Sequence, residues 1–244
     1  MASGYSILRS CAICLATARH FRIILDEMDV ETTLKRDLFG DVALKTDETG
    51  PVIVRNTTSA RWWVRWLARY LLRREARALA ALDGIDGVPR LLHVERDKLV
   101  RSYISGAPMH HAKPADVDWF NAASRLLRRL HCAGVSHNDL AKEPNLLVRD
   151  DGTPAIIDFQ LAWHSQARGR LFRIAAHEDI RHLLKHKRTY RADRLTRRER
   201  DILANPSPRS RIWMGTAKPV YLFVTRRLLG WADREGAGDR GSRN

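Results

Sequence analysis

The chain has 244 residues, and its 43 Lys and Arg against 28 Asp and Glu give a formal net charge of +15. With 44% hydrophobic residues it is long and apolar enough for one large domain or two modest lobes, which excludes a mini-protein or a mostly disordered chain. Its three cysteines, Cys11, Cys14 and Cys132, are too few for a disulfide framework and favour a reducing compartment.

Hydropathy and charge indicate where the protein is located and which partners suit it. We find no run of about 18 apolar residues, so we predict no transmembrane helix. The reducing compartment that the cysteines favour makes the cytoplasm the expected location. The charge would suit a polyanionic partner, such as nucleic acid, an anionic membrane or a phosphorylated sugar polymer, and does not choose among them. We interpret residues 1–28 as an N-terminal extension and residues 236–244 as a flexible tail.

The first half is rich in strand signals. Short apolar runs between residues 32 and 55, interrupted by Gly40 and Gly50, predict two or three antiparallel strands. Residues 60–82 contain no Gly or Pro and have apolar side chains at helical spacing, so a helix is predicted there. Residues 90–94 and 98–104 then form a second predicted hairpin.

The second half is mainly helical. Asp118 is predicted to cap a helix that runs to about Cys132 and stops at Gly134. Residues 145–148 and 155–157 read as a hairpin, because the connection contains Asp-Gly. From Glu178 the pattern is helical and basic.

One segment carries a recognisable chemistry. His137 and Asp139 follow the predicted helix, Asn145 opens the first hairpin strand, and Asp158 follows the second. This order resembles the catalytic loop and metal-binding motif of the protein-kinase-like superfamily. Phosphoryl transfer needs a carboxylate that orients the attacking hydroxyl and oxygen ligands that hold Mg²⁺ on the nucleotide.

The resemblance implies roles for individual residues and a fold. Asp139 would be the catalytic base, Asn145 and Asp158 would bind Mg²⁺ or Mn²⁺, and Lys142 would neutralise the transferring phosphate. The implied fold is α+β, with a small antiparallel-sheet lobe at 29–104, a mostly helical lobe at 105–235, and ATP between them.

The motif departs from the usual kinase pattern at several positions. Five residues separate Asp139 from Asn145, one more than usual, Asn138 replaces an Arg, and Gln160 replaces the Gly of Asp-Phe-Gly. No Ala-Pro-Glu follows Asp158, so a platform for peptide substrates is reduced or absent. Over residues 34–187 this shortened plan resembles the RIO family of atypical kinases and the bacterial lipopolysaccharide-core sugar kinases.

The nucleotide-binding half of the resemblance leaves alternatives open. Gly40 stands where the phosphate-covering loop normally has several glycines. Arg55 takes the third-strand position of the phosphate-binding Lys, with Glu75 on the following helix as its ion-pair partner, and Lys45 is the rival candidate. Asp179 resembles an aspartate that braces the catalytic loop, or is a charge near the start of a helix.

Three basic stretches leave their interpretation open. Residues 61–70 and 220–231 mix Trp, Tyr, Phe and Arg, which is typical of helices packed on the protein with arginines reaching water, of membrane-surface helices or, less favoured, of a nucleic-acid surface. Residues 181–188 would receive an anionic substrate or form a solvated basic helix face.

The expected activity is Mg²⁺-dependent transfer of the ATP γ-phosphoryl to a hydroxyl. The acceptor would be a protein Ser/Thr, as in serine/threonine protein kinases, or a sugar of a lipopolysaccharide-type glycolipid. The alternative from another class is a pseudokinase, a nucleotide-binding scaffold. Peripheral contact with the inner face of the membrane is a further expectation, and nucleic acid is the less favoured partner.

Overall fold

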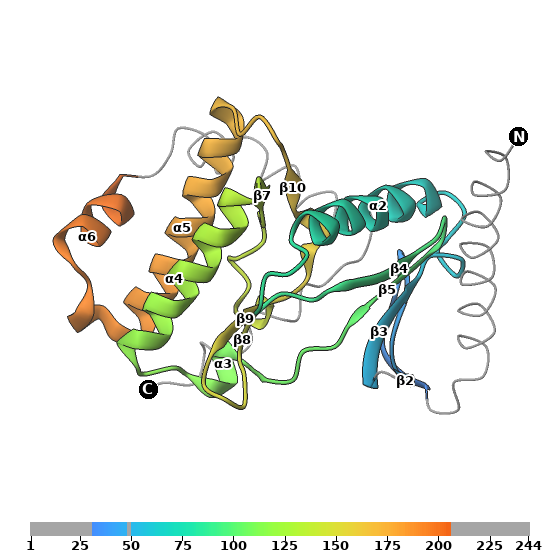
Figure 1. The fold of residues 1–244 in the computed structure, drawn as a ribbon, viewed down its shortest axis with the longest axis horizontal. Coiled ribbons are helices and arrows are strands. Elements are labelled where there is room, and N and C mark those ends of the chain that lie inside the picture. Colours follow the sequence, from blue (N-terminus) through green and yellow to red (C-terminus); the bar gives the residue numbers. More distant parts are fainter. Residues whose placement is uncertain (1–30, 48–49, 206–244) are drawn as a thin grey trace, which may run out of the picture. The chain divides into compact units, whose positions relative to one another are not determined.

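A computed structural model describes residues 31–47 and 50–205 of the chain. The described residues group into two compact units (Figure 1). One unit contains residues up to Arg73 together with Arg90–Tyr103, and the other contains Arg74–Pro89 together with residues from Ile104 onward. The lobe boundaries 29–104 and 105–235 stay a prediction.

The first unit is built on a five-stranded antiparallel sheet with the order β1-β2-β3-β5-β4. Its strands are β1 (Glu31–Asp37), β2 (Gly40–Asp47), β3 (Gly50–Asn56), β4 (Leu91–Val94) and β5 (Lys98–Ser102). All four pairings are antiparallel, which confirms the predicted strands in both stretches.

The central strand β3 gives the sheet its core. Val52 and Val54 lie on the same face of β3 and pack with Val100 of β5. Val100 is paired with Val54 across the two strands. Successive side chains of a strand point to opposite faces, so Ile53 and Arg55 share the other face.

Helix α2 (Arg65–Ala81) connects β3 to β4 and begins later than predicted. The expected start at Ala60 is wrong, because residues 62–64 form a turn in which Val64 N donates to Arg61 O. The first helical bond runs from Ala68 N to Val64 O at 2.9 Å. The division between the two units falls within this helix.

The second unit contains short strands and helices. Its elements are β6 (Ala107–Pro108), α3 (Met109–Ala112), α4 (Val117–Cys132), β7 (Val135–Ser136), the 3₁₀ helix η1 (Glu143–Asn145), β8 (Leu146–Val148), β9 (Pro154–Ile156), the 3₁₀ helix η2 (Phe159–Leu161), β10 (Trp163–His164), α5 (Arg170–Arg191), the 3₁₀ helix η3 (Ala192–Arg194) and α6 (Arg197–Ala204). The predicted hairpin is confirmed, since β8 pairs antiparallel with β9. Together, an antiparallel sheet unit and a mainly helical unit confirm the α+β class.

Helix α4 begins and ends with recognisable signals. Its cap is Asp116 and not Asp118, because the Asp116 carboxylate accepts the Asp118 N–H at 2.9 Å. The predicted stop at Gly134 is confirmed: its φ is +76°, and a Cβ there would lie 2.7 Å from Ser165 O.

Helix α5 corrects two expectations about the basic stretch near its middle. It begins at Arg170, eight residues before the predicted start at Glu178. Neither interpretation of residues 181–188 holds for Arg181 or Lys187, which are only 4% exposed each. Arg181 pairs with Glu178 at 3.1 Å, and Lys187 pairs with Glu199 of α6 at 2.7 Å.

Some expectations fall on other parts of the chain. The N-terminal extension 1–28, the aromatic stretch 220–231 and the tail 236–244 lie outside the described residues. Within 31–47 and 50–205, no helix combines the length and apolar character that a membrane span requires.

Candidate active site

The loop that follows β7 brings the predicted catalytic residues together in the second unit. His137 is fully buried, and its Nε2 donates to Ile157 O at 2.9 Å while its Nδ1 accepts the Asp139 N–H at 3.3 Å. These two contacts make Nε2 the donor and Nδ1 the acceptor of the ring. The side chain therefore connects the loop to the residue just before Asp158, as expected for a bracing histidine.

Asp179 of α5 holds the start of the same loop. Its carboxylate is fully buried and accepts the N–H groups of His137 and Asn138 at 2.7 and 2.8 Å. Its Oδ2 also lies 3.2 Å from His131 Nε2 on α4. The prediction that Asp179 braces the loop is confirmed, and Asn138, whose φ is +65°, has its backbone fixed in a conformation that Asn tolerates.

The carboxylate of Asp139 lies between two predicted partners. Lys142 Nζ is 3.1 Å from Asp139 Oδ2, and Asn145 Nδ2 donates to Asp139 O at 2.9 Å and to Oδ2 at 3.3 Å. Burial raises the pKa of Asp139 above its ordinary value of 3.8, and the positive charge of Lys142 partly opposes the rise. The negative charge of Asp158 adds to it. A raised pKa makes this carboxylate a stronger proton acceptor than an ordinary aspartate.

The additional residue between Asp139 and Asn145 is taken up by a tight turn. Lys142 N donates to Asp139 O, and Asn145 N donates to Lys142 O at 3.2 Å, so the chain enters η1 directly. Pro144 lies at the start of this short helix, where it loses no hydrogen bond. As a result Asn145 reaches Asp139 despite the longer loop.

Asp158 has an unusual backbone and an unpaired oxygen. Its φ and ψ are 64° and 68°, the left-handed region that non-glycine residues rarely adopt. Among the described residues its buried Oδ1 has no hydrogen-bond partner. A buried carboxylate oxygen costs free energy unless something pairs with it, so this atom is suited to a cation.

The segment after Asp158 is fixed on both sides. Phe159 is fully buried, and its ring meets the His137 ring edge to face with centroids 4.8 Å apart. Arg74 donates through Nε to Ala162 O at 2.6 Å and through Nη2 to Leu161 O at 2.9 Å. Gln160, which replaces the usual Gly, is accommodated within η2.

The oxygens of Asn145 and Asp158 fit a divalent cation carried by a nucleotide. The Asn145 Nδ2 donates to Asp139, which leaves the side-chain oxygen of Asn145 available to accept a ligand. Mg²⁺ is usually held by one or two protein oxygens together with phosphates and water. In the described part of the chain no group of three or more His, Cys, Asp or Glu forms an all-protein metal site.

Sequence reasoning missed a second set of contacts to this loop. His186 of α5 lies with Nε2 2.7 Å from Leu140 O, and the Tyr190 hydroxyl donates to Glu143 Oε2 at 2.6 Å. The three α5 residues Asp179, His186 and Tyr190 are seven and four positions apart, which places them on one helix face. Their helical spacing could have predicted that these three residues share a face, but no sequence signal predicts which loop residues they contact.

The two rival phosphate-binding residues of the sheet unit, Arg55 and Lys45, lie on different strands. Arg55 (6% exposed) lies on β3 opposite Val42, whereas Lys45 of β2 lies opposite Val52. Directly paired residues share a face, and Val42 and Lys45 are three residues apart, so Arg55 and Lys45 lie on opposite faces of the sheet. Only one of them can serve a nucleotide bound against one face.

Two further residues complete that set. Glu75 is 2% exposed on α2. Gly40 begins β2 with φ +123°, and a Cβ there would lie 2.1 Å from Asn56 O, so packing alone requires glycine at this position. The roles predicted for Gly40, Lys45, Arg55 and Glu75 stay predictions.

Comparison with known proteins places this geometry in context. No family model matches the chain. It is 32% identical over 123 residues to the "Probable SapB synthase" of Streptomyces coelicolor, a match that covers 41% of this chain and 13% of that protein. The crystal structure of the Rio2 kinase from Chaetomium thermophilum is similar with a TM-score of 0.55 and 18% identity, covering 76% of this chain and 65% of that one.

The structural match shows that the chain has a protein-kinase-like fold, which confirms the predicted two-lobed fold class. At 18% identity the likeness concerns the fold alone. The chain spans less than two thirds of the length of both relatives. The resemblance to lipopolysaccharide-core sugar kinases stays a prediction.

Proposed function

We propose that this protein is a phosphotransferase that moves the γ-phosphoryl group of ATP to a hydroxyl group with the help of Mg²⁺ or Mn²⁺. The observation that carries the proposal is the arrangement around Asp139. Its carboxylate, with a raised pKa, lies within hydrogen-bonding distance of Asn145 and Lys142. The kinase-like fold supports the same chemistry at a coarse level.

Each residue has a part that follows from its surroundings. Asp139 orients the acceptor hydroxyl and takes its proton, because burial strengthens it as a base. Lys142, with a side chain 55% exposed, neutralises charge on the transferring group. Asn145 and the unpaired oxygen of Asp158 hold the metal ion, which offsets the negative charge of the phosphates.

Two acceptors have nearly equal weight: a Ser or Thr hydroxyl of a protein, which the kinase-like fold supports, and a sugar hydroxyl of a glycolipid. The route of the chain after Asp158 supports the glycolipid. The chain passes from Asp158 through η2 and β10 to the start of α5 at Arg170, so only residues 159–169 are available to support a peptide. A sugar hydroxyl needs no extended peptide platform.

Two measurements test the proposal without knowledge of the acceptor. Thermal melting with ATP and Mg²⁺ should show a metal-dependent rise in Tm for the wild type that is lost in Asp158→Ala, since a ligand stabilises only the state it binds. The matched control is Asp118→Ala, which removes an exposed carboxylate of α4. An equal rise in Asp158→Ala would contradict the assigned metal site.

Phosphoryl transfer from labelled ATP then separates an enzyme from a pseudokinase. Asp139→Asn should retain the ATP-dependent rise in Tm and lower transfer by about a hundredfold or more, because the amide cannot accept the proton. Protein and core-glycolipid acceptors are offered in parallel. ATP binding by the wild type without transfer to either acceptor would support the pseudokinase alternative.

A further inference from the structure

Four aromatic side chains gather in the exposed start of α2 and the turn before it. Trp62 is 82% exposed, Trp63 39%, Trp66 69% and Tyr70 48%. Trp62, Trp66 and Tyr70 follow one another at intervals of four residues, and Trp66 and Tyr70 share one face of α2. We call these four residues the aromatic patch. Single exposed apolar residues are common on proteins, whereas a group of this size indicates a binding surface.

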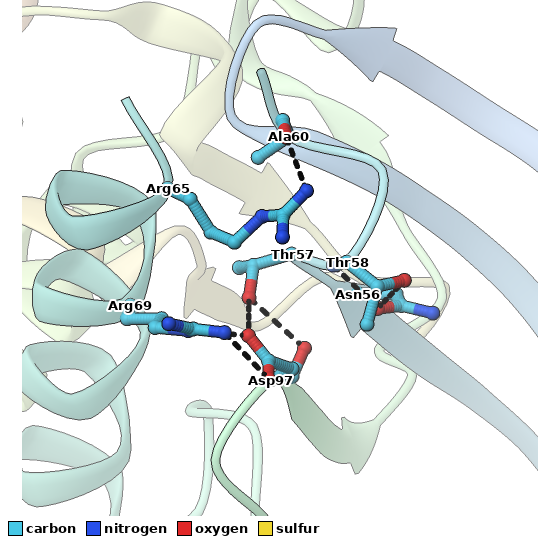
Figure 2. A network of polar contacts seen from close by, with 7 residues as sticks. All are labelled: Asn56, Thr57, Thr58, Ala60, Arg65, Arg69 and Asp97. Carbon is cyan, nitrogen blue, oxygen red and sulfur yellow. Dashed lines mark hydrogen bonds and ion pairs between the residues drawn. The ribbon is translucent and has the colours of Figure 1, made fainter. Parts of the chain in front are cut away.

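The backbone beneath the aromatic patch is fixed by a polar network, which Figure 2 shows. Arg69 donates through Nε and Nη2 to the two carboxylate oxygens of Asp97 at 2.6 and 3.1 Å. Thr57, fully buried, donates to the same carboxylate at 3.0 Å, and its N–H donates to Asp97 O at 2.8 Å. Arg65 Nη2 donates to Ala60 O. The start of α2 is thereby tied to the end of β3 and to the β4–β5 turn.

The segment that presents the aromatic patch is basic. Residues 57–74 contain five arginines and no Asp or Glu, within a chain of net charge +15. Arg61 is exposed next to Trp62. An anionic surface would therefore meet attractive charge from the same segment that presents the aromatic rings.

Trp and Tyr with neighbouring Arg are the combination that favours the boundary between water and lipid. Their rings are apolar, and the indole N–H and phenol O–H remain able to bond to headgroups. A nucleic acid would draw its affinity mainly from cations on its phosphates. Two of the nearest arginines are already engaged, Arg69 with Asp97 and Arg65 with Ala60. The exposed rings of Trp62, Trp66 and Tyr70 are therefore the feature that distinguishes this surface, and a lipid membrane fits it better.

We propose that the aromatic patch docks the protein onto an anionic lipid membrane, with Trp62 and Trp66 entering the headgroup region and Arg61 contacting lipid phosphates. This inference stands on the exposure, spacing and charge of the segment. It does not depend on phosphoryl transfer.

The test is co-sedimentation of the full chain with vesicles of phosphatidylcholine containing about 30 mol % phosphatidylglycerol. We expect the wild type to bind, and to bind less as salt is added, because surface charges are screened. The double variant Trp62→Ser/Trp66→Ser should bind about tenfold more weakly. The variant Trp62→Tyr/Trp66→Tyr, which keeps amphipathic rings, should retain most of the binding.

The matched control is Leu171→Ser on α5, which removes another exposed apolar side chain (62% exposed) and should leave vesicle binding unchanged. The Tm of each variant is measured first, and only variants that melt at the wild-type temperature are compared, so that unfolding does not explain a loss of vesicle binding. Failure of the wild type to bind, or equal binding by Trp62→Ser/Trp66→Ser, would overturn the proposal. So would dimerisation in solution, or sedimentation with single-stranded RNA in preference to vesicles, that depends on the same two tryptophans.

Discussion

His186 of α5 lies with its Nε2 2.7 Å from the main-chain oxygen of Leu140, the residue directly after Asp139. On the same helix face, Asp179 accepts from the start of the loop and Tyr190 donates to Glu143 near its end. One helix therefore contacts the predicted catalytic loop at three successive points. The position of the Asp139 backbone depends on α5 as much as on the loop sequence.

Asp179 should be the most costly of these contacts to remove. Asp179→Ala leaves two buried N–H groups, those of His137 and Asn138, without their acceptor. We expect the free energy of unfolding, measured with urea, to fall by about 3 kcal/mol. Asp193→Ala is the control, because that carboxylate is 60% exposed and its loss should leave the free energy of unfolding nearly unchanged. If the two substitutions lowered the free energy of unfolding equally, the hydrogen bonds from Asp179 would not stabilise the loop.

The sequence predicted those parts of the fold whose signals are local. The apolar run of β3, the Asp151-Gly152 turn between β8 and β9, and the order of Asp139, Asn145 and Asp158 are all visible over short stretches of sequence. These patterns carry the family resemblance from which the fold class and the candidate site are predicted.

The start of α5 and the contacts between distant residues could not be predicted in the same way. The N-cap of α5 is Gly169, which has no side chain to signal a helix start. Tyr190 reaches Glu143 across 47 positions, and Lys187 is buried only because α6 returns Glu199 to it. Such pairs are set by packing between distant parts of the chain. For this reason the basic residues 181–188 resemble an exposed surface in the sequence although Lys187 is buried.

The raised pKa of Asp139 leads to a prediction about pH. If transfer requires the ionised carboxylate, activity falls as the pH drops through the pKa of Asp139, which lies above 3.8 because of burial. The charge of Lys142 lowers this pKa, so Lys142→Ala should move the acidic limb of the pH–kcat/KM profile to higher pH. Lys113→Ala, a change to an exposed lysine at the end of α3, should leave it in place. A limb that moves to lower pH would contradict the assignment.

The opposite faces of Arg55 and Lys45 allow their rival roles to be separated. We predict that Arg55→Ala weakens ATP binding by about tenfold or more, since a charge-assisted contact to phosphate contributes roughly 1.5–3 kcal/mol. Lys45→Ala on the neighbouring strand should leave ATP affinity nearly unchanged. Titration of each purified variant with a fluorescent ATP analogue measures both. The reverse pattern would transfer the phosphate-binding role to Lys45.

His182 should make the stability of the fold depend on pH. Burial on α5, followed by the charge of Lys185, lowers its pKa from 6.5 to about 4, while Glu178 and Asp179 oppose the shift. Between these values the unfolded chain binds a proton that the folded chain does not, so the free energy of unfolding should fall as the pH drops from 6.5 toward 4. Over this pH range the protonation of His182 should lower the free energy of unfolding by about 3 kcal/mol in total.

Urea denaturation at a series of pH values measures this effect, and His182→Gln isolates it. The variant should lose less stability than the wild type on acidification, because glutamine binds no proton in this range. His111→Gln provides the comparison, since His111 is exposed at the end of α3 and its replacement should leave the slope unchanged. If His182→Gln and the wild type lost stability in parallel, the acid sensitivity would have to come from another group, such as His186. Burial lowers the pKa of His186 from 6.5, so it also binds a proton in the unfolded chain first.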